Sequence, residues 1–390
     1  MNYLLLRLKR FCGFVTGFVF LIGGILKLMD PVGAGLVMNG YLEFLNIGFF
    51  SPAAKMLGVL FASAETIIGA ALITGVWRKV MGITALAFQI FFTILTLLLV
   101  IFKPEMDCGC FGEAIHLTHS ETFIKNIILL ALLAAYFFPT KRLGSPKKKK
   151  YVTFAIVTIS AAVFGAYSWL YIPMVDFTDY KVASALKAGH SFESAGERYE
   201  ALFTYEKDGV QKSFDLDHLP DSTWTFVSTE TVEVESNGND RLIDLSFCDS
   251  DGEYHDELAT TGRVLVISVY NPNISKSKEE HIIKLMENAN RAGIKPLLLI
   301  AGNPGRPWAK DAYYADYKTL IALNRSNGGA TYFNEGYLIQ KWASIETPDF
   351  DDLAELTGRD DTETIIEQNT EGSLGFQGFL LYIFAILLLI

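Results

Sequence analysis

The sequence predicts an α-helical membrane bundle joined to an α/β domain outside the membrane, and hydropathy and charge carry this prediction. The chain has 390 residues, of which 51% are hydrophobic, and this length suggests two or more domains. Residues 1–173 hold 15 Lys and Arg against 7 Asp and Glu, whereas residues 174–390 hold 18 against 36. The basic residues form no nucleic-acid signature, so we expect no nucleic-acid partner. Four cysteines are too few for a disulfide scaffold.

Six apolar stretches are candidate membrane spans, because about 17–25 apolar residues cross a bilayer. They are residues 11–28, 52–76, 80–102, 122–138, 151–172 and the shorter 375–390. The first begins like a signal peptide, but no small-x-small cleavage site follows and more spans do, so we expect it to be retained. For the last stretch, a buried or interfacial helix is the alternative to a span.

The basic residues predict the orientation of these spans. Eleven of the 15 lie before the first span, between the second and third, or between the fourth and fifth. Because short cytoplasmic loops are rich in Lys and Arg, we expect a cytoplasmic N-terminus. Loops 29–51 and 103–121 and residues 174–374 then face outward. In a bacterium this is the periplasmic side of the inner membrane.

Two cysteines stand in an outward loop, in the run Asp107-Cys-Gly-Cys-Phe-Gly112. Thiols outside the cytoplasm tend to oxidise, so Cys108 and Cys110 can form a disulfide. A bridge this short is strained and prone to exchange, and it removes little chain entropy. These properties favour an exchanging redox pair over a structural staple, although a merely structural pair stays open.

A metal site is a further alternative for this loop. His116 and His119 follow the cysteines, and together the four side chains offer ligands for zinc or copper(I). The spacing is not that of a standard structural zinc site. The histidines can instead belong to a polar helix entry, with Thr118 or Ser120 as the cap.

Charged residues inside the spans are few. Glu65 is the only acid well inside one, and such carboxylates are costly and usually functional or paired. It is a candidate proton site or a polar anchor between helices. Lys27 can extend toward the membrane surface and pair locally with Asp30. Cys12 reads as a small packing residue.

Three runs carry a family resemblance: "GGILKLMDPVGAGLVMNGYLEF", "AETIIGAALITG" and "DCGCFGEAIHLTHSETFIKNIILL". They resemble DoxX-like membrane proteins, in particular the methylamine-utilisation MauE type in its Bacteroidetes form, which is fused to a thioredoxin-like domain. The likeness covers roughly residues 11–140, and the CGCFG run with the Thr122-Phe-x-x-Asn126 helix start is its most specific part.

The resemblance implies a four-helix DoxX/MauE-like bundle with Cys108 and Cys110 as the redox pair and Glu65 as the internal carboxylate. MauE is associated with disulfide formation in a subunit of methylamine dehydrogenase, and related bundle proteins pass electrons from thiols to quinones. A quinone cofactor and an extracytoplasmic protein partner are therefore implied. Function inferred from fold remains an analogy.

The acidic half reads as alternating strands and helices. Residues 262–270 and 294–302 are apolar strands, 277–293 and 316–324 are helical, and a hairpin turns at Asn334-Glu-Gly336. This is the order of a thioredoxin-like fold. The Cys-x-x-Cys of that family is missing, however, because its place reads "NPNISKSK". Without a thiolate there is no nucleophile for exchange, so we expect a binding or docking module.

Two features of this half have ordinary interpretations. Cys248 is a lone thiol and reads as structural. The acidic run "DSDGEYHDE" does not match an EF-hand loop, which favours a solvated turn.

The expected domains follow in chain order. They are the membrane bundle (1–140), a basic cytoplasmic linker (141–150), a fifth span (151–173), a connecting segment (174–224), the thioredoxin-like domain without CxxC (225–356), an acidic linker (357–374) and a sixth span (375–390). Two functions remain open: a membrane thiol–disulfide oxidoreductase or its accessory, and a non-catalytic anchor or assembly factor that presents the outer domain.

Overall fold

The computed structural model describes most of the chain. The described residues are 3–104, 106, 108–137, 146–187, 199–207, 210–214, 225–233, 242–302, 308–309 and 311–388. Asp107 of the cysteine run lies outside them, as do parts of the linker expected at 141–150 and of the connecting segment expected at 174–224.

Six helices of the described chain are long and apolar enough to cross a membrane. They are α1 (Tyr3–Met29), α3 (Ala54–Thr74), α4 (Arg78–Phe102), α5 (His119–Phe137), α6 (Lys148–Leu170) and α10 (Asp361–Leu388). Each coincides with one of the predicted stretches, and α10 continues the last of them back to Asp361. The prediction of a membrane helical region is confirmed.

The helices are held closely by small residues. A side-chain carbon at Gly69 of α3 would lie 2.5 Å from the backbone nitrogen of Leu21 and 2.7 Å from the carbonyl oxygen of Gly17, both on α1. Such contacts between backbones are typical of packed membrane helices. Beside this pair lie α6 and α10, whose Phe164 and Phe379 rings stack with their centroids 4.2 Å apart.

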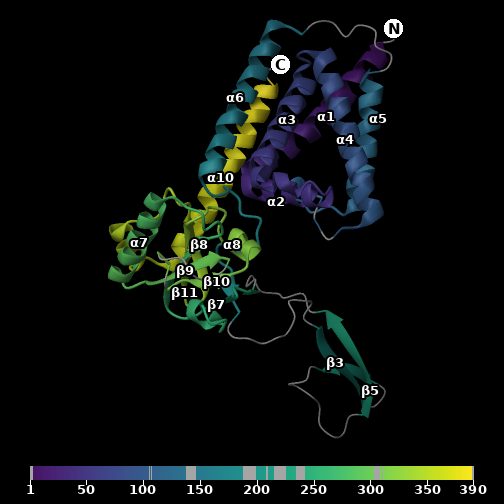
Figure 1. The fold of residues 1–390 in the computed structure, drawn as a ribbon. Helices are drawn as coiled ribbons and strands as arrows, with labels where there is room; N and C mark the ends of the chain where they lie inside the picture. The colour runs from purple at the N-terminus through teal and green to yellow at the C-terminus, as the bar shows by residue number, and fades with distance from the viewer. Residues whose placement is uncertain are drawn as a thin grey trace.

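The loop 29–51, which was expected to face outward, contains a helix that was not predicted from the sequence. Helix α2 (Pro31–Phe44) starts at Asp30, whose Oδ1 accepts a hydrogen bond of 2.8 Å from the backbone nitrogen of Gly33. Proline at the first helical position is favourable because its missing N–H would be unpaired there. A short 3₁₀ helix, η1 (Gly48–Ala53), follows. Figure 1 shows α2 across the end of the membrane bundle that lies nearest the strands β8 and β11.

Both described chain ends lie at the other end of the bundle (Figure 1). Arg10 before the first span, Arg78 between the second and third, and Lys147 before the fifth all interact electrostatically with Lys150. The basic loops therefore gather at one end, as an alternating path through a membrane requires.

The acidic half contains an eight-stranded mixed sheet, which together with the helices packed on it is called the outer domain. Its order is β6-β2-β12-β11-β8-β9-β10-β7, and its strands are β2 (Ala185–Leu186), β6 (Leu242–Ile243), β7 (Phe247–Cys248), β8 (Arg263–Val269), β9 (Lys295–Ala301), β10 (Tyr313–Ala315), β11 (Gly329–Asn334) and β12 (Tyr337–Trp342). Strands β8, β9 and β10 are parallel, and β11 and β12 form an antiparallel hairpin beside β8. The strands expected at 262–270 and 294–302 and the hairpin are confirmed.

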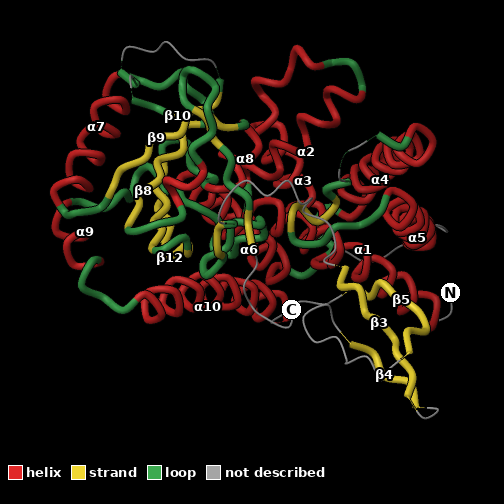
Figure 2. Tube along the Cα trace, turned by 90° about the horizontal axis from the view of Figure 1, so that it is seen from below, coloured by secondary structure: helices red, strands yellow, loops and turns green. Residues whose placement is uncertain are grey.

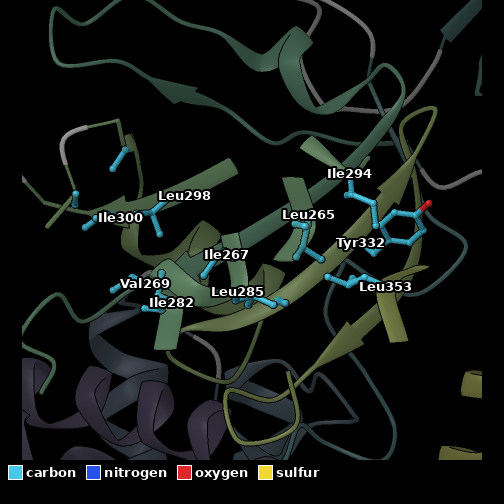
Figure 3. Close-up of a cluster of buried hydrophobic side chains, with 14 of the residues drawn as sticks. Leu265, Ile267, Val269, Ile282, Leu285, Ile294, Leu298, Ile300, Tyr332 and Leu353 are labelled. Carbon is cyan, nitrogen blue, oxygen red and sulfur yellow. The ribbon is translucent and has the colours of Figure 1, made fainter. Parts of the chain in front are cut away.

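Both faces of this sheet are buried. Leu265, Ile267 and Val269 of β8 pack with residues of α7 (Lys276–Arg291) and α9 (Phe350–Leu356) (Figure 3). The alternate residues Val264 and Val266 face the opposite cluster, which includes residues of α8 (Tyr317–Leu323). Helices on two faces explain why β8 is buried continuously from Val264 to Val269 rather than at every second residue. The 3₁₀ turn η3 (Asp256–Ala259) closes the end near β7.

A second sheet stands apart from the first. Strands β3 (Tyr199–Lys207), β4 (Val210–Phe214) and β5 (Thr225–Glu233) form it in the order β4-β3-β5. Figures 1 and 2 show it away from the eight-stranded sheet. Residues 225–233 thus belong with this small sheet, and not with the larger one.

Helix α10 connects the larger sheet to the membrane. The side-chain amide of Gln368 donates to the carbonyl oxygen of Lys341 on β12 (2.8 Å) and accepts from its backbone nitrogen (3.1 Å). Because α10 is continuous from Asp361 to Leu388, this amide fixes the outer end of a membrane helix to the edge of the β11–β12 hairpin.

Candidate functional site

The cysteine run forms a tight turn against α2. Strand β1 (Cys110–Glu113) begins at the second cysteine. Gly109 has φ +55°, and a side-chain carbon there would lie 2.3 Å from Val37 of α2. Only glycine meets both demands. The hydroxyl group of Tyr41, also on α2, donates a hydrogen bond to the carbonyl oxygen of Cys108.

The two thiols differ in exposure. Cys108 is buried and Cys110 is half-buried. They line one cavity of about 60 Å³ at the outer end of the bundle, together with Lys27, Tyr41 and Glu65. A cavity of this size holds a few water molecules. The cavity lining therefore includes both cysteines, a cation, a carboxylate and a phenol, but the structure does not place the two thiols against each other.

Lys27 and Glu65 form an ion pair between α1 and α3. The Lys27 Nζ lies 2.7 Å from both carboxylate oxygens of Glu65, and both side chains are largely buried. The expected local pair between Lys27 and Asp30 is not formed, because Asp30 turns toward the outer domain. Glu65 is thus a polar anchor between helices, one of the two roles expected for it.

Tyr41 interacts electrostatically with three groups of the cavity, Cys110, Cys108 and Glu65. Burial, followed by the neighbouring Cys110 and Cys108, raises the pKa of Tyr41 well above its ordinary value. Its hydroxyl group therefore stays protonated and continues to donate to the cysteine turn.

The histidines do not gather with the cysteines. The Nε2 of His119 lies 2.9 Å from the carbonyl oxygen of Met106. Thr118 and Glu121 bond reciprocally at the start of α5, with the backbone nitrogen of Thr118 donating to Glu121 (2.9 Å) and its hydroxyl group accepting from Glu121 (3.3 Å). Thr118 thus caps α5, as one of the alternatives expected.

The metal alternative gains no support at the cysteines. In the part of the chain that the structure describes, the group of three or more ligand side chains lying within 4.8 Å of one another is Asp249, Glu253 and His255. That group stands in the acidic run at the far end of the sheet. It consists of exposed and half-buried side chains already bonded to each other, with 2.9 Å between Asp249 Oδ2 and His255 Nε2.

A polar seam between α4 and α5 borders the cavity. Gln89 on α4 donates to the carbonyl oxygen of Asn126 (3.1 Å), and the Asn126 amide nitrogen lies 3.2 Å from the Thr96 hydroxyl oxygen. The resemblance had singled out Asn126, but Gln89 and Tyr41 were missed. A lone amide inside an apolar span is the signal that could have found Gln89.

Comparison with known proteins gives two matches. Residues 2–139 match the family model described as methylamine utilisation protein MauE. The match covers α1 to α5, so this part of the membrane region is similar to MauE, and α6 and α10 lie outside it. Residues 199–236 match a domain of unknown function, DUF8463, which covers the small three-stranded sheet. No curated protein and no solved structure matches the chain. With its six candidate spans, the chain is a multi-pass membrane protein.

The outer domain contacts the membrane end of the chain through Arg325, which was not singled out from the sequence. Arg325 lies between α8 and β11, and its Nε is 3.0 Å from Oδ2 of Asp30 at the start of α2. Its Nη2 is 3.7 Å from Oε1 of Glu113 in the cysteine strand β1. Arg325 and Asp30 are both buried. The arginine therefore connects the outer domain to the segment that carries Cys110.

A second buried ion pair stands at the same junction. Nζ of Lys341 on β12 lies 2.6 Å from Oδ2 of Asp176, in the segment after α6. Burial opposes the charge of Asp176, but the Lys341 ammonium group and the hydrogen bonds from Lys341 and Thr178 together outweigh burial and lower the pKa of Asp176. Burial lowers the pKa of Lys341 despite the same contact. The pair fixes the chain where it leaves the membrane.

Proposed function

We propose that this protein takes part in thiol–disulfide exchange, or in disulfide formation, in an extracytoplasmic partner through Cys108 and Cys110. The observation that supports this most is the shared cavity, since both cysteines line it beside the Lys27–Glu65 pair and Tyr41. The match to the methylamine utilisation protein MauE over residues 2–139 supports the resemblance, and the resemblance implies a role in disulfide formation.

The difference in exposure assigns the two thiols different roles in this proposal. Half-buried Cys110 meets the partner, and buried Cys108 is the thiol that is released when the mixed disulfide forms and that resolves this disulfide in the reverse direction. In the direction that oxidises the partner, a Cys108–Cys110 disulfide is attacked by a partner thiolate. The Cys108–Cys110 bond breaks, Cys108 leaves as a thiolate and takes up a proton, and a partner–Cys110 disulfide forms. A second partner thiolate then displaces Cys110, which leaves a partner disulfide and two thiols here.

The next cycle needs an oxidant, for which we propose a quinone that accepts two electrons and two protons. Lys27 and Lys125 both line the cavity, and nearby cations favour the thiolate that transfers the electrons. Glu65, the acceptor of the Lys27 bond, is the candidate proton site. This reaction belongs on the periplasmic side of a bacterial inner membrane, with the basic loops in the cytoplasm.

The eight-stranded sheet has a supporting role in the proposal. Along the chain, β8, α7, β9, α8 and the β11–β12 hairpin follow one another, with the short β10 between β9 and α8, and this succession supports the proposal of a thioredoxin-like domain. We infer a docking module that presents the partner to the cysteine turn. The Arg325 contact with Glu113 supports this inference because Glu113 ends the strand that Cys110 begins.

A second function has its own observation in favour. The loop between β8 and α7 carries no cysteine, so the outer domain lacks a thiol pair of its own at the position where a thioredoxin-like domain would carry one. This absence fits a non-catalytic anchor or assembly factor whose membrane helices hold the outer domain in place.

The redox state of the pair distinguishes the two functions. In native membranes, alkylation with a thiol-reactive mass tag should label Cys108 and Cys110 only after mild reduction. The Cys12→Ser/Cys248→Ser double variant should show the same two masked thiols, which assigns them to Cys108 and Cys110. The Cys108→Ser variant should accumulate a mixed disulfide through Cys110. If both thiols are alkylated without reduction, and neither single variant traps a partner, the exchange proposal fails and the anchor function replaces it.

A further inference from the structure

A cavity of about 220 Å³ lies between the outer end of the membrane helices and the outer domain. The membrane helices contribute Asp30, Lys55 and Trp169 to its lining, and the outer domain contributes Tyr270, Lys278 and Arg325. The cavity sits at the carboxyl end of β8, the edge where parallel sheets bind ligands. It is distinct from the cysteine cavity, whose lining does not include Lys55, Lys278 or Arg325.

Positive charge exceeds negative charge around this cavity. Three of its lining side chains are cations and one, Asp30, is an acid, which is already paired with Arg325. Lys55 and Lys278 are close enough to repel each other, and burial lowers the pKa of Lys278. Such buried cations are costly unless an anion joins them.

Donor capacity also remains on the arginine. The Nε of Arg325 is buried and makes no hydrogen bond among the described residues, although Asp30 Oδ2 lies 3.0 Å away. The Arg325 side chain is 6% exposed. A guanidinium group with an unused donor beside two lysines is suited to an oxyanion, and to phosphate in particular.

The walls of the cavity are fixed by hydrogen bonds. The hydroxyl group of Tyr270 donates to the carbonyl oxygen of Arg325 (3.2 Å). The backbone nitrogen of Ser326 donates to the side chain of Asn324 (2.9 Å), and the Asn327 amide group bonds both backbone groups of Asn271. The arginine loop is therefore held in place before any ligand binds.

The membrane side points to the source of the anion. Nζ of Lys55 lies 4.2 Å from the ring centroid of Trp169, and Trp169 is 41% exposed near the end of α6. Tryptophan is common at the level of lipid headgroups. A lipid phosphate at this level can reach a cavity lined by Lys55 and Trp169.

We propose that this cavity binds a phosphate group, carried by an anionic phospholipid of the adjacent leaflet or by soluble phosphate. The bound phosphate accepts hydrogen bonds from Lys55, Lys278 and Arg325 and thereby joins the membrane helices to the outer domain. This inference goes beyond thiol exchange and does not depend on it.

The test uses the full-length chain, delipidated in a non-ionic detergent. Native mass spectrometry measures retention of added phosphatidylglycerol. Thermal unfolding is followed in inorganic phosphate and in chloride at equal ionic strength. We expect one retained phosphatidylglycerol molecule per chain. Loss of one lysine contact should weaken binding about tenfold or more, since hydrogen bonds to charged groups are worth about 1.5–3 kcal/mol.

The variants locate the binding. Lys278→Gln should lose the ligand, Lys278→Arg should retain it because the charge remains, and Lys284→Gln is the matched control on the exposed side of α7. Stabilisation by inorganic phosphate alone, lost in Lys278→Gln, would support the site with a soluble source. Absence of both effects in the wild-type chain overturns the proposal, as does equal weakening by Lys278→Gln and Lys284→Gln.

Discussion

The membrane helices and the eight-stranded sheet use different contacts to hold their elements together. Between α1 and α3 the backbones nearly touch, with no room for a side-chain carbon at Gly69, and the Lys27–Glu65 pair adds a charged contact. In the outer domain, large apolar side chains such as Ile267 and Tyr332 fill the space between sheet and helices. The hydrophobic effect contributes little to the association of helices in lipid, whereas in water it favours the burial of apolar side chains in the sheet domain.

The junction combines both kinds of contact. Arg325 and Lys341 of the outer domain make buried ion pairs with Asp30 and Asp176 at the membrane end, while Gln368 of α10 bonds the backbone of β12. Charge therefore fixes the position of the two regions, and the apolar cores stabilise each region by itself.

The largest effect is expected at the membrane pair. Glu65→Gln leaves the Lys27 ammonium group buried without its partner, and breaking a buried pair in this way costs about 3–5 kcal/mol. The double variant Lys27→Met/Glu65→Leu should recover most of this loss, because it removes both charges. Reversible unfolding of the full chain in detergent measures both changes.

A matched control is Glu43→Gln, which alters an exposed acid bonded to Asn39 on α2. It should change stability by less than about 0.5 kcal/mol. Equal effects of Glu65→Gln and Glu43→Gln would contradict the role given to the buried pair.

The elements of this chain were more predictable than their contacts. The lengths of the apolar stretches predicted the six membrane helices, and the apolar runs of β8 and β9 predicted the central strands. Both predictions succeed because buried elements have a local pattern of apolar residues in the sequence. Helix α2 was missed because its composition, with three glycines and a proline, does not look helical on its own. Tyr41 lies on this helix and was therefore not singled out either.

Long-range ion pairs leave no such pattern. Lys27 stands three residues from Asp30 in the chain, yet it bonds Glu65, 38 residues away. Asp30 instead meets Arg325 across the junction. Sequence proximity predicted the wrong partner for both, since only the packing of α1 on α3 and of the outer domain on α2 decides these contacts.

A smaller effect is expected in the outer core. Ile267→Ala removes a fully buried side chain at the centre of β8, and such truncations cost about 2–5 kcal/mol. Hydrogen exchange followed by mass spectrometry should show faster exchange in β8, β9 and β11 and unchanged protection in α1 and α3. Ile283→Ala, which truncates an exposed position of α7, is the control. Equal loss of protection in the membrane helices would mean that the two regions unfold as one unit.

The smallest effect is expected at the partly exposed pair of His255 and Asp249. The hydrogen bond that His255 donates to the Asp249 carboxylate raises the pKa of His255, and the same bond lowers the pKa of Asp249. The contribution of His255 to stability is therefore complete below its ordinary pKa and is lost as the pH rises through its raised pKa. The contribution of Asp249 is present above its ordinary pKa and is lost as the pH falls through its lowered one.

Between the lowered pKa of Asp249 and the raised pKa of His255, both members of the pair are charged. NMR titration of isotope-labelled histidine in the full chain should place the pKa of His255 above that of a free histidine, and Asp249→Asn should lower it. Asp251→Asn is the control, because this neighbouring acid is not among the groups that shift His255. A pKa of His255 that falls equally in both variants would show that the net charge of the acidic turn, and not the bond to Asp249, holds the proton.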